Sequence, residues 1–175
     1  MRIIGGLYKG RTLYEFKGND IRPTSDFARE SLFNIINQKI VDKTFLDLFC
    51  GTGAVGLEAL SRGAKKAVFC DISRESINLT KKNVEKVKTN KAIIILKDAI
   101  SFIDNTTEKF DYIFIDSPYQ NEVGVRALSI CSKILADGGT IIYENQTPLK
   151  NELLDLILVD QRKYGRAYLS FYQKR

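Results

Sequence analysis

The chain has 175 residues, of which 44% are hydrophobic and 27% are charged. This length suits one domain that buries roughly 70% of its unfolded surface, and no apolar run approaches the roughly 18 residues that a membrane span needs. The sequence contains no histidine and only three scattered cysteines, which excludes Ser-His-Asp and Cys-His catalysis and histidine metal sites. We therefore expect a reduced, cytoplasmic protein without a metal site, whose chemistry depends on carboxylates, backbone groups and a cofactor. We also expect a monomer.

The net charge of +6 is compatible with a polyanionic partner, although many basic proteins bind no nucleic acid. No repeat, low-complexity tract or interdomain linker interrupts the chain. We expect a single domain over residues 1–175, with an N-terminal β-hairpin extension at 1–20 and an α/β core at 21–175.

The first 18 residues alternate short apolar and basic positions around glycines, which predicts two short strands joined through Lys9-Gly10. Cationic and aromatic side chains are interleaved along this hairpin. They are Arg2, Tyr8, Lys9, Arg11, Tyr14, Phe16 and Lys17. Two interpretations remain open: a hairpin with packed rings and solvated lysines, or a flap whose cations meet phosphates and whose rings stack on bases.

A helix is predicted from about Asp26 to Ile40, with Arg22 and Arg29 near its start, and from residue 44 strands alternate with helices. The predicted strands are Thr44–Phe49, Lys66–Asp71, Ala92–Leu96, Tyr112–Asp116 and Thr140–Glu144, and the predicted helices are Ala54–Arg62, 74–87 with Ser73 as its cap, Asp98–Asp104 and Val123–Leu135. Such apolar strands with crossover helices indicate a parallel sheet that is covered on both faces. Two final strands, Leu156–Gln161 and Ala167–Tyr172, are too close for a crossover and must pair antiparallel.

A glycine-rich turn follows the first core strand. Gly51, Gly53 and Gly56 satisfy the G-x-G-x-x-G spacing, which lets backbone N–H groups approach a nucleotide-type cofactor but is a weak signal alone. Asp47 precedes this turn by four residues, where it can hold the turn or attract an ammonium group. A pyrophosphate would be repelled by that carboxylate, so a sulfonium cofactor with an α-ammonium group fits better than a dinucleotide.

Four successive strands end in an aspartate, and ligands of open α/β sheets bind at the carboxyl ends of strands. Asp71 is placed to bind two ribose hydroxyls, and Asp98 is placed to accept from the amine of an adenine that lies against Ile72. Single aspartates are common in turns, but four of them beside the glycine turn indicate one site. The residues expected to bind the cofactor are Asp47, Phe49, Cys50, Gly51, Thr52, Gly53, Asp71, Ile72, Asp98, Ala99 and Asp116.

The fourth strand ends in Asp116-Ser117-Pro118-Tyr119. Pro118 stiffens the turn, so Asp116 and the Ser117 carbonyl offer two acceptors while Tyr119 offers a flat ring. This combination suits a planar amine, whose –NH₂ donates to both acceptors while its ring stacks on the tyrosine. The alternative is an ordinary β-turn with a buried tyrosine.

The sequence resembles the S-adenosylmethionine-dependent amino-methyltransferases with an Asp/Asn-Pro-Pro-Tyr/Phe signature, and more narrowly the RsmD family of 16S ribosomal RNA (guanine-N2)-methyltransferases. The matching blocks span nearly the whole chain: Gly5-Gly6, Lys9-Gly10-Arg11, Arg22-Pro23-Thr24, Arg29 to Asn34, Asp47 to Gly53, Gly56 to Ala64, Asp116 to Tyr119 and Tyr164 to Ala167. Two positions depart from the pattern. Ser117 replaces the first proline of the signature, and Asp71 stands where such families often have glutamate.

The resemblance implies a Rossmann-like methyltransferase fold, S-adenosyl-L-methionine as cofactor, and methylation of the N2 amine of a guanine, guanine 966, in the 16S rRNA of the small ribosomal subunit or an assembly intermediate. Asp116, Ser117, Pro118 and Tyr119 would then hold the base. The residues expected to contact RNA are Arg2, Lys9, Arg11, Arg22, Arg29, Arg162, Lys163 and Arg166. The remaining alternatives are methylation of a DNA adenine or a protein glutamine, an NAD-binding oxidoreductase, and a non-catalytic RNA-binding protein with the same fold.

Overall fold

The computed structural model describes residues 1–17, 26–117, 122–148, 153 and 155–175. In this part of the chain a 7-stranded sheet has the order β3-β2-β1-β4-β5-β7-β6. The strands are β1 Thr44–Asp47, β2 Lys66–Asp71, β3 Ala92–Leu96, β4 Phe110–Ile115, β5 Leu135–Asn145, β6 Leu156–Tyr164 and β7 Ala167–Lys174. The helices are α1 Asp26–Ile36, α2 Ala54–Ser61, α3 Arg74–Val87, α4 Ala99–Asn105 and α5 Glu122–Ile130, with 3-10 turns at Asn37–Ile40 and Cys131–Ile134.

The sheet is parallel from β3 to β5 and antiparallel at its end, where β7 pairs with both β5 and β6. The predicted parallel sheet closed by an antiparallel hairpin is therefore confirmed. Because the core strands are parallel, their carboxyl ends meet at one edge. In this register Asp47 lies opposite both Phe69 on β2 and Phe114 on β4, and Asp71 lies opposite Leu96 on β3.

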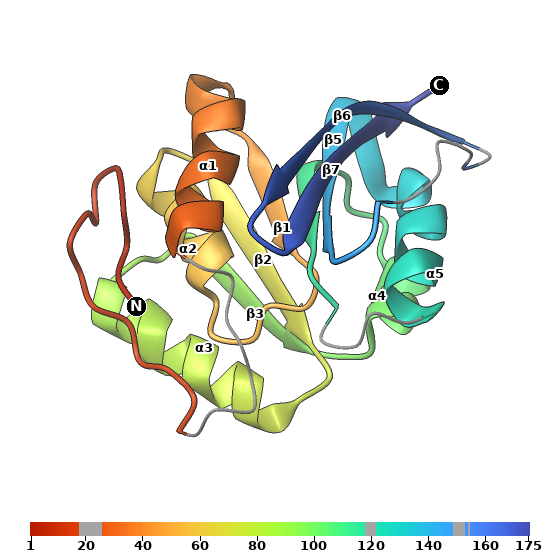
Figure 1. Cartoon of the computed structure of the whole chain (residues 1–175). Helices are drawn as coiled ribbons and strands as arrows, with labels where there is room; N and C mark the ends of the chain where they lie inside the picture. Colours follow the sequence, from red (N-terminus) through yellow and green to blue (C-terminus); the bar gives the residue numbers. More distant parts are fainter. Residues whose placement is uncertain (18–25, 118–121, 149–152, 154) are drawn as a thin grey trace.

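Helices α1, α2 and α3 cover one face of the sheet, and α4 and α5 cover the other (Figure 1). Successive side chains of β1 alternate between the two layers, since Phe45 belongs to the first apolar cluster and Leu46 to the second. Burial on both faces explains why the core strands are apolar without a polar alternation. This packing fixes the strand ends that carry the polar residues of the candidate site.

Several element ends differ from those predicted. The first helix ends at Ile36 rather than Ile40, and Asn37 adopts a left-handed conformation with φ 42° before a 3-10 turn. The predicted helix Val123–Leu135 divides into α5 and a second 3-10 turn, and β5 already begins at Leu135. These ends depend on tertiary packing, which hydrophobic spacing does not report.

Residues 1–17, the N-terminal segment, double back as predicted but form no pair of strands. The backbone N–H of Ile3 donates to the Arg11 carbonyl at 3.0 Å, and that of Leu13 donates to the Met1 carbonyl at 3.0 Å. Within these residues β-pairing is limited to a single bridge, between Arg2 and Thr12. The predicted chain reversal is thus present, but the two predicted strands are not. The backbone of residues 4–8 donates to Glu58 and Ser61 on α2 rather than to a second strand.

Candidate cofactor and active site

The glycine turn joins β1 to α2 and is held from below by Asp47. This side chain is 1% exposed, and its Oδ2 accepts from the backbone N–H of Gly56 at 3.0 Å. Gly56 allows close packing of the helix on the sheet, since a Cβ there would lie 2.3 Å from the Phe69 ring. Asp47 therefore holds the start of α2 and lies beneath the turn. This bond supports the first of its two predicted roles, which is to hold the turn.

The pKa of Asp47 is raised to about 7, mainly by burial; the Gly56 N–H opposes this rise, and the negative charges of Asp116 and Asp71 contribute to it. A cation at this site would stabilise the ionised carboxylate. The electrostatics therefore favour a positively charged ligand group and disfavour a phosphate.

Replacing Asp47 with asparagine should flatten the pH dependence of stability. The folded-state pKa of Asp47 lies above the unfolded value of 3.8, so its contribution to stability is full below pH 4 and is lost as pH rises through about 7. Urea unfolding between pH 5 and 8 should show the wild type losing up to about 1.4 kcal/mol per pH unit relative to Asp47→Asn. Asp42→Asn, at an exposed position, serves as control; parallel curves for wild type and Asp47→Asn would contradict this assignment.

Asp71, at the end of β2, is bound to the glycine turn. Its Oδ2 accepts from the Gly51 N–H at 3.0 Å, and its Oδ1 accepts from the Ser73 N–H at 2.8 Å. Each carboxylate oxygen retains a further lone pair for a ligand hydroxyl. The next residue, Ile72, is 70% exposed, which leaves a flat apolar surface beside the carboxylate.

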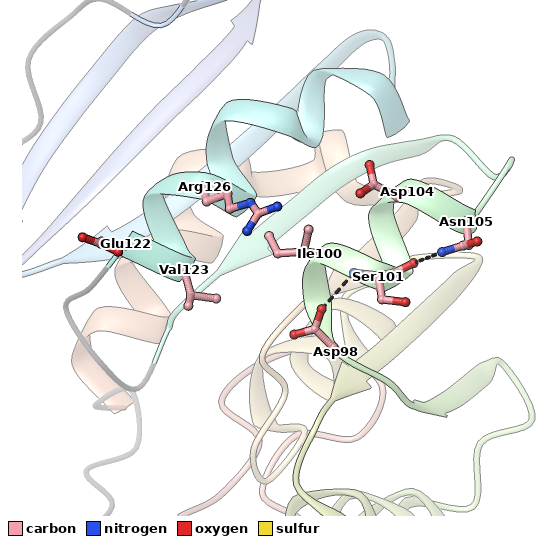
Figure 2. Close-up of a pocket in the computed structure, with 8 residues that line it drawn as sticks. All are labelled: Asp98, Ile100, Ser101, Asp104, Asn105, Glu122, Val123 and Arg126. Atoms are coloured by element: carbon pink, nitrogen blue, oxygen red, sulfur yellow. Dashed lines mark hydrogen bonds between the residues drawn. The ribbon is translucent and has the colours of Figure 1, made fainter.

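Asp98 caps α4, since its Oδ1 accepts from the Ser101 N–H at 2.9 Å, and Ala99 is the buried first residue of that helix. The side chain borders a cavity of about 550 Å³ between α4 and α5, in which Ile100 and Arg126 extend toward each other (Figure 2). Its full lining is Asp98, Ile100, Ser101, Asp104, Asn105, Glu122, Val123 and Arg126. The volume is within the range of small-molecule sites, so there is room for a ring beside Asp98.

The strand-end carboxylates act on one another and on Cys70. Burial, followed by the charges of Asp71, Asp98 and Asp47, raises the pKa of Cys70 to about 12. Asp47 responds in turn to Asp116 and Asp71. The charges of Asp71, Asp98 and Asp116 thus reach the buried ends of β1 and β2, as expected for residues that end neighbouring parallel strands.

Three expected cofactor residues sit at this turn with little side-chain exposure. Cys50 is 6% exposed with its Sγ 3.5 Å from the Thr80 hydroxyl, and Thr52 is also 6% exposed. Phe49 is half-buried against the second apolar cluster. Burial keeps the side chains of Cys50 and Thr52 inside the turn, and the Cys50 backbone is bound as well, since its N–H donates to the Cys70 carbonyl at 3.0 Å and its carbonyl accepts from the Gly53 N–H at 2.7 Å.

Asp116 and Ser117 follow β4, and Pro118 and Tyr119 lie outside the described residues. Ser117 packs on α5 at Gly124, where a Cβ would lie 2.9 Å from the Ser117 Cβ and 3.0 Å from the Tyr143 hydroxyl. Burial and the nearby charge of Asp116 raise the pKa of Tyr143. Gly124 and Tyr143 thus support the Asp116-Ser117 end of the turn, a role that their sequence positions did not indicate.

The residues expected to contact RNA differ in exposure, and Arg22 lies outside the described residues. The exposed ones are Arg2, Lys9, Arg11, Arg162, Lys163 and Arg166. Several are already held by neighbours: Arg11 lies over the Tyr8 ring at 5.1 Å and donates to the Val87 carbonyl, and Lys163 lies over the Tyr168 ring at 5.5 Å. Arg162 pairs with Asp160 at 2.9 Å.

The RNA contact predicted for Arg29 is wrong. This side chain is 0% exposed, and it donates to Asp26 at 2.9 Å and to the Arg2 carbonyl. It also lies 3.8 Å from the buried carboxylate of Glu58 on α2. Arg29 is a structural cation that joins α1, α2 and the N-terminal segment.

No helix in the described ranges is both long and apolar enough to cross a membrane. The family described as Conserved hypothetical protein 95 matches residues 1–173. Ribosomal RNA small subunit methyltransferase D of Haemophilus influenzae is 34% identical over 85% of this chain and 81% of its own length, and that of Escherichia coli is 34% identical over 83% and 75%.

Among solved structures, that of Escherichia coli yhhF superposes with a TM-score of 0.90 at 32% identity, covering 100% of this chain and 98% of the other. The Rossmann-like methyltransferase fold expected from the resemblance is thereby confirmed. The chain belongs to the Conserved hypothetical protein 95 family, the family of the RsmD-type ribosomal RNA methyltransferases.

Proposed function

We propose that the chain transfers a methyl group from S-adenosyl-L-methionine to the exocyclic N2 amine of a guanine, guanine 966, in 16S rRNA of the small ribosomal subunit. The observation that carries the proposal is the binding of the glycine turn by two strand-end carboxylates, since Asp47 accepts from the Gly56 N–H and Asp71 from the Gly51 N–H, each at 3.0 Å. The names of the relatives support ribosomal RNA as the substrate class. The guanine and its N2 atom come from the family resemblance, while the chemistry of the Asp116 turn supports a planar amine as the methyl acceptor.

The cofactor site fits a nucleoside that carries positive charge. Asp71 would accept from the two ribose hydroxyls, Asp98 from the adenine amine, and Ile72 would lie against the adenine ring. Asp47 would attract the α-ammonium group, because a cation relieves the unfavourable ionisation of this buried carboxyl. When bound, the cofactor supplies an electrophilic methyl group.

The amine site would be formed by the Asp116-Ser117-Pro118-Tyr119 turn. The Asp116 carboxylate and the Ser117 carbonyl would each accept a hydrogen bond from one N–H of the amine, which orients the nitrogen lone pair. Tyr119 would stack on the base. The guanine must leave its stack to reach this site. Catalysis then comes from positioning and electrostatics, without a covalent intermediate on the protein.

The substrate would be held by basic groups from separate parts of the chain. Arg2, Lys9 and Arg11 on the N-terminal segment, Arg22, and Arg162, Lys163 and Arg166 at the β6–β7 turn would contact phosphates. We infer binding as a monomer to the small subunit or one of its assembly intermediates.

The proposal is tested by offering the protein labelled S-adenosylmethionine together with unmodified small subunits, naked 16S rRNA, DNA or total protein. Label should enter 16S rRNA, in free or assembled form. Label in DNA adenine or in a glutamine side chain would replace the proposal with one of the other amino-methyltransferase activities. Thermal protection by NADH but not by S-adenosylhomocysteine would instead favour an oxidoreductase.

A further inference from the structure

The N-terminal segment lies against α2 and α3, the two helices that flank the glycine turn (Figure 1). Its backbone is bound by side chains of both helices. Glu58 on α2 accepts from the N–H groups of Ile4 and Gly5, each at 2.8 Å, and the Ser61 hydroxyl accepts from the Tyr8 N–H at 2.9 Å. The segment is thus attached to the elements that shape the cofactor site.

Asn83 on α3 joins this segment to the glycine turn directly. Its side chain is 0% exposed and makes three hydrogen bonds. Its Oδ1 accepts from the Tyr14 N–H at 2.7 Å, and its Nδ2 donates to the Tyr14 carbonyl at 3.1 Å and to the Thr52 carbonyl at 2.9 Å. Thr52 lies between the first two glycines of the turn, so the side-chain amide of Asn83 binds both the N-terminal segment and the glycine turn.

Two further contacts support the same connection. One helical turn before Asn83, the Thr80 hydroxyl donates to the Gly51 carbonyl at 2.9 Å. Two residues after Tyr14, the ring of Phe16 lies over the turn, with its Cε2 3.8 Å from the position that a Cβ on Gly51 would occupy. The N-terminal segment therefore contacts the glycine turn directly through the Phe16 ring and indirectly through Asn83.

The outer side of the same segment carries the exposed groups suited to RNA. The Tyr14 ring is 50% exposed, and the Lys86 ammonium lies 4.3 Å from its centroid. Lys9 and Lys17 are exposed nearby in the chain. Tyr14 thus presents its ring and a cation to the outside while Asn83 binds its backbone from the inside.

We propose that Asn83 is a positioning residue that couples RNA binding at the N-terminal segment to cofactor binding at the glycine turn. The inference rests on the proposed function. The segment has no regular secondary structure, and Ile3 and Leu13 are its only two buried apolar side chains. We therefore expect its contact with α2 and α3 to open more easily than the helices and the glycine turn themselves. Each ligand favours the docked arrangement, and linkage then requires each to tighten the other by the same factor.

The coupling is measured as the ratio of two dissociation constants of labelled S-adenosylhomocysteine, without and with saturating small ribosomal subunits. The wild type should show a ratio of about 10, within the range of about 5 to 150 typical of coupled sites. Asn83→Ser, which shortens the bridging side chain, should reduce the ratio to near 1. Asn78→Ser, at an exposed position of the same helix, should leave it unchanged.

A purely structural role for Asn83 would change stability or both affinities alike, but not their ratio. Independent binding of the two ligands to the wild type overturns the proposal without recourse to any variant, as does a ratio that persists in Asn83→Ser. Methyl transfer by the wild-type samples is followed in parallel. Transfer without coupling leaves the proposed function standing and removes only the role of Asn83, whereas absence of transfer removes both.

Discussion

Replacing Asp116 with alanine should reduce the rate of methyl transfer by about 10²- to 10³-fold, because the amine loses one of the two acceptors that orient it. S-adenosylhomocysteine and RNA should still bind, since Asp71, Asp98 and the basic segment are untouched. Single-turnover transfer at saturating cofactor and small subunits measures the effect.

The control is Asp137→Ala, which removes a fully exposed carboxylate near the start of β5, whereas Asp116 lies beside the end of that strand. This variant should leave the rate unchanged. Asp116→Asn keeps an acceptor oxygen and should retain more activity than the alanine variant. Full activity of Asp116→Ala would show that the amine is oriented by other groups and would overturn the assigned mechanism.

Replacing Glu58 with alanine should destabilise the protein by about 3–5 kcal/mol, because it removes one of the two carboxylates beside the buried Arg29 guanidinium and leaves the Ile4 and Gly5 N–H groups without their acceptor. The side chain of Glu58 is 0% exposed and accepts from Ile4, Gly5 and the Arg62 Nε, the last at 2.7 Å. Urea unfolding gives the free energy, and hydrogen exchange should show lost protection at the Ile4 and Gly5 amides.

A matched control for Glu58 is Glu85→Ala, on the exposed side of α3. It should change stability by no more than about 0.5 kcal/mol, as is usual for surface positions. Equal losses for the two variants would mean that the buried carboxylate does not hold the N-terminal segment on α2.

The sequence was most informative where a local pattern determines the structure. Apolar strands alternating with amphipathic helices predicted the parallel sheet, and the short connection at Arg162 to Arg166 predicted the antiparallel end. Aspartates at successive strand ends predicted one site because parallel strands share a carboxyl edge. These arguments need only neighbouring residues and the topology of the sheet.

The sequence was least informative about side chains whose partners are remote. Arg29 was predicted to contact RNA from its place near a helix start. Its burial beside Glu58, which lies on another helix, leaves no signal in the neighbouring residues. Asn83 was not singled out, since its partners Tyr14 and Thr52 are 69 and 31 residues away. No periodicity signals such contacts, and a buried asparagine on an amphipathic helix has no distinguishing pattern.

Methyl transfer to a guanine of 16S rRNA can be tested by identifying the methylated nucleoside. Small subunits that lack the modification are incubated with the protein and labelled S-adenosylmethionine, and the 16S rRNA is digested and analysed by mass spectrometry. Label should appear in N2-methylguanosine at a single position, guanine 966. Label on another atom or base, such as N6-methyladenosine, would contradict the guanine-N2 assignment, and RNA without label would contradict methyl transfer to rRNA itself.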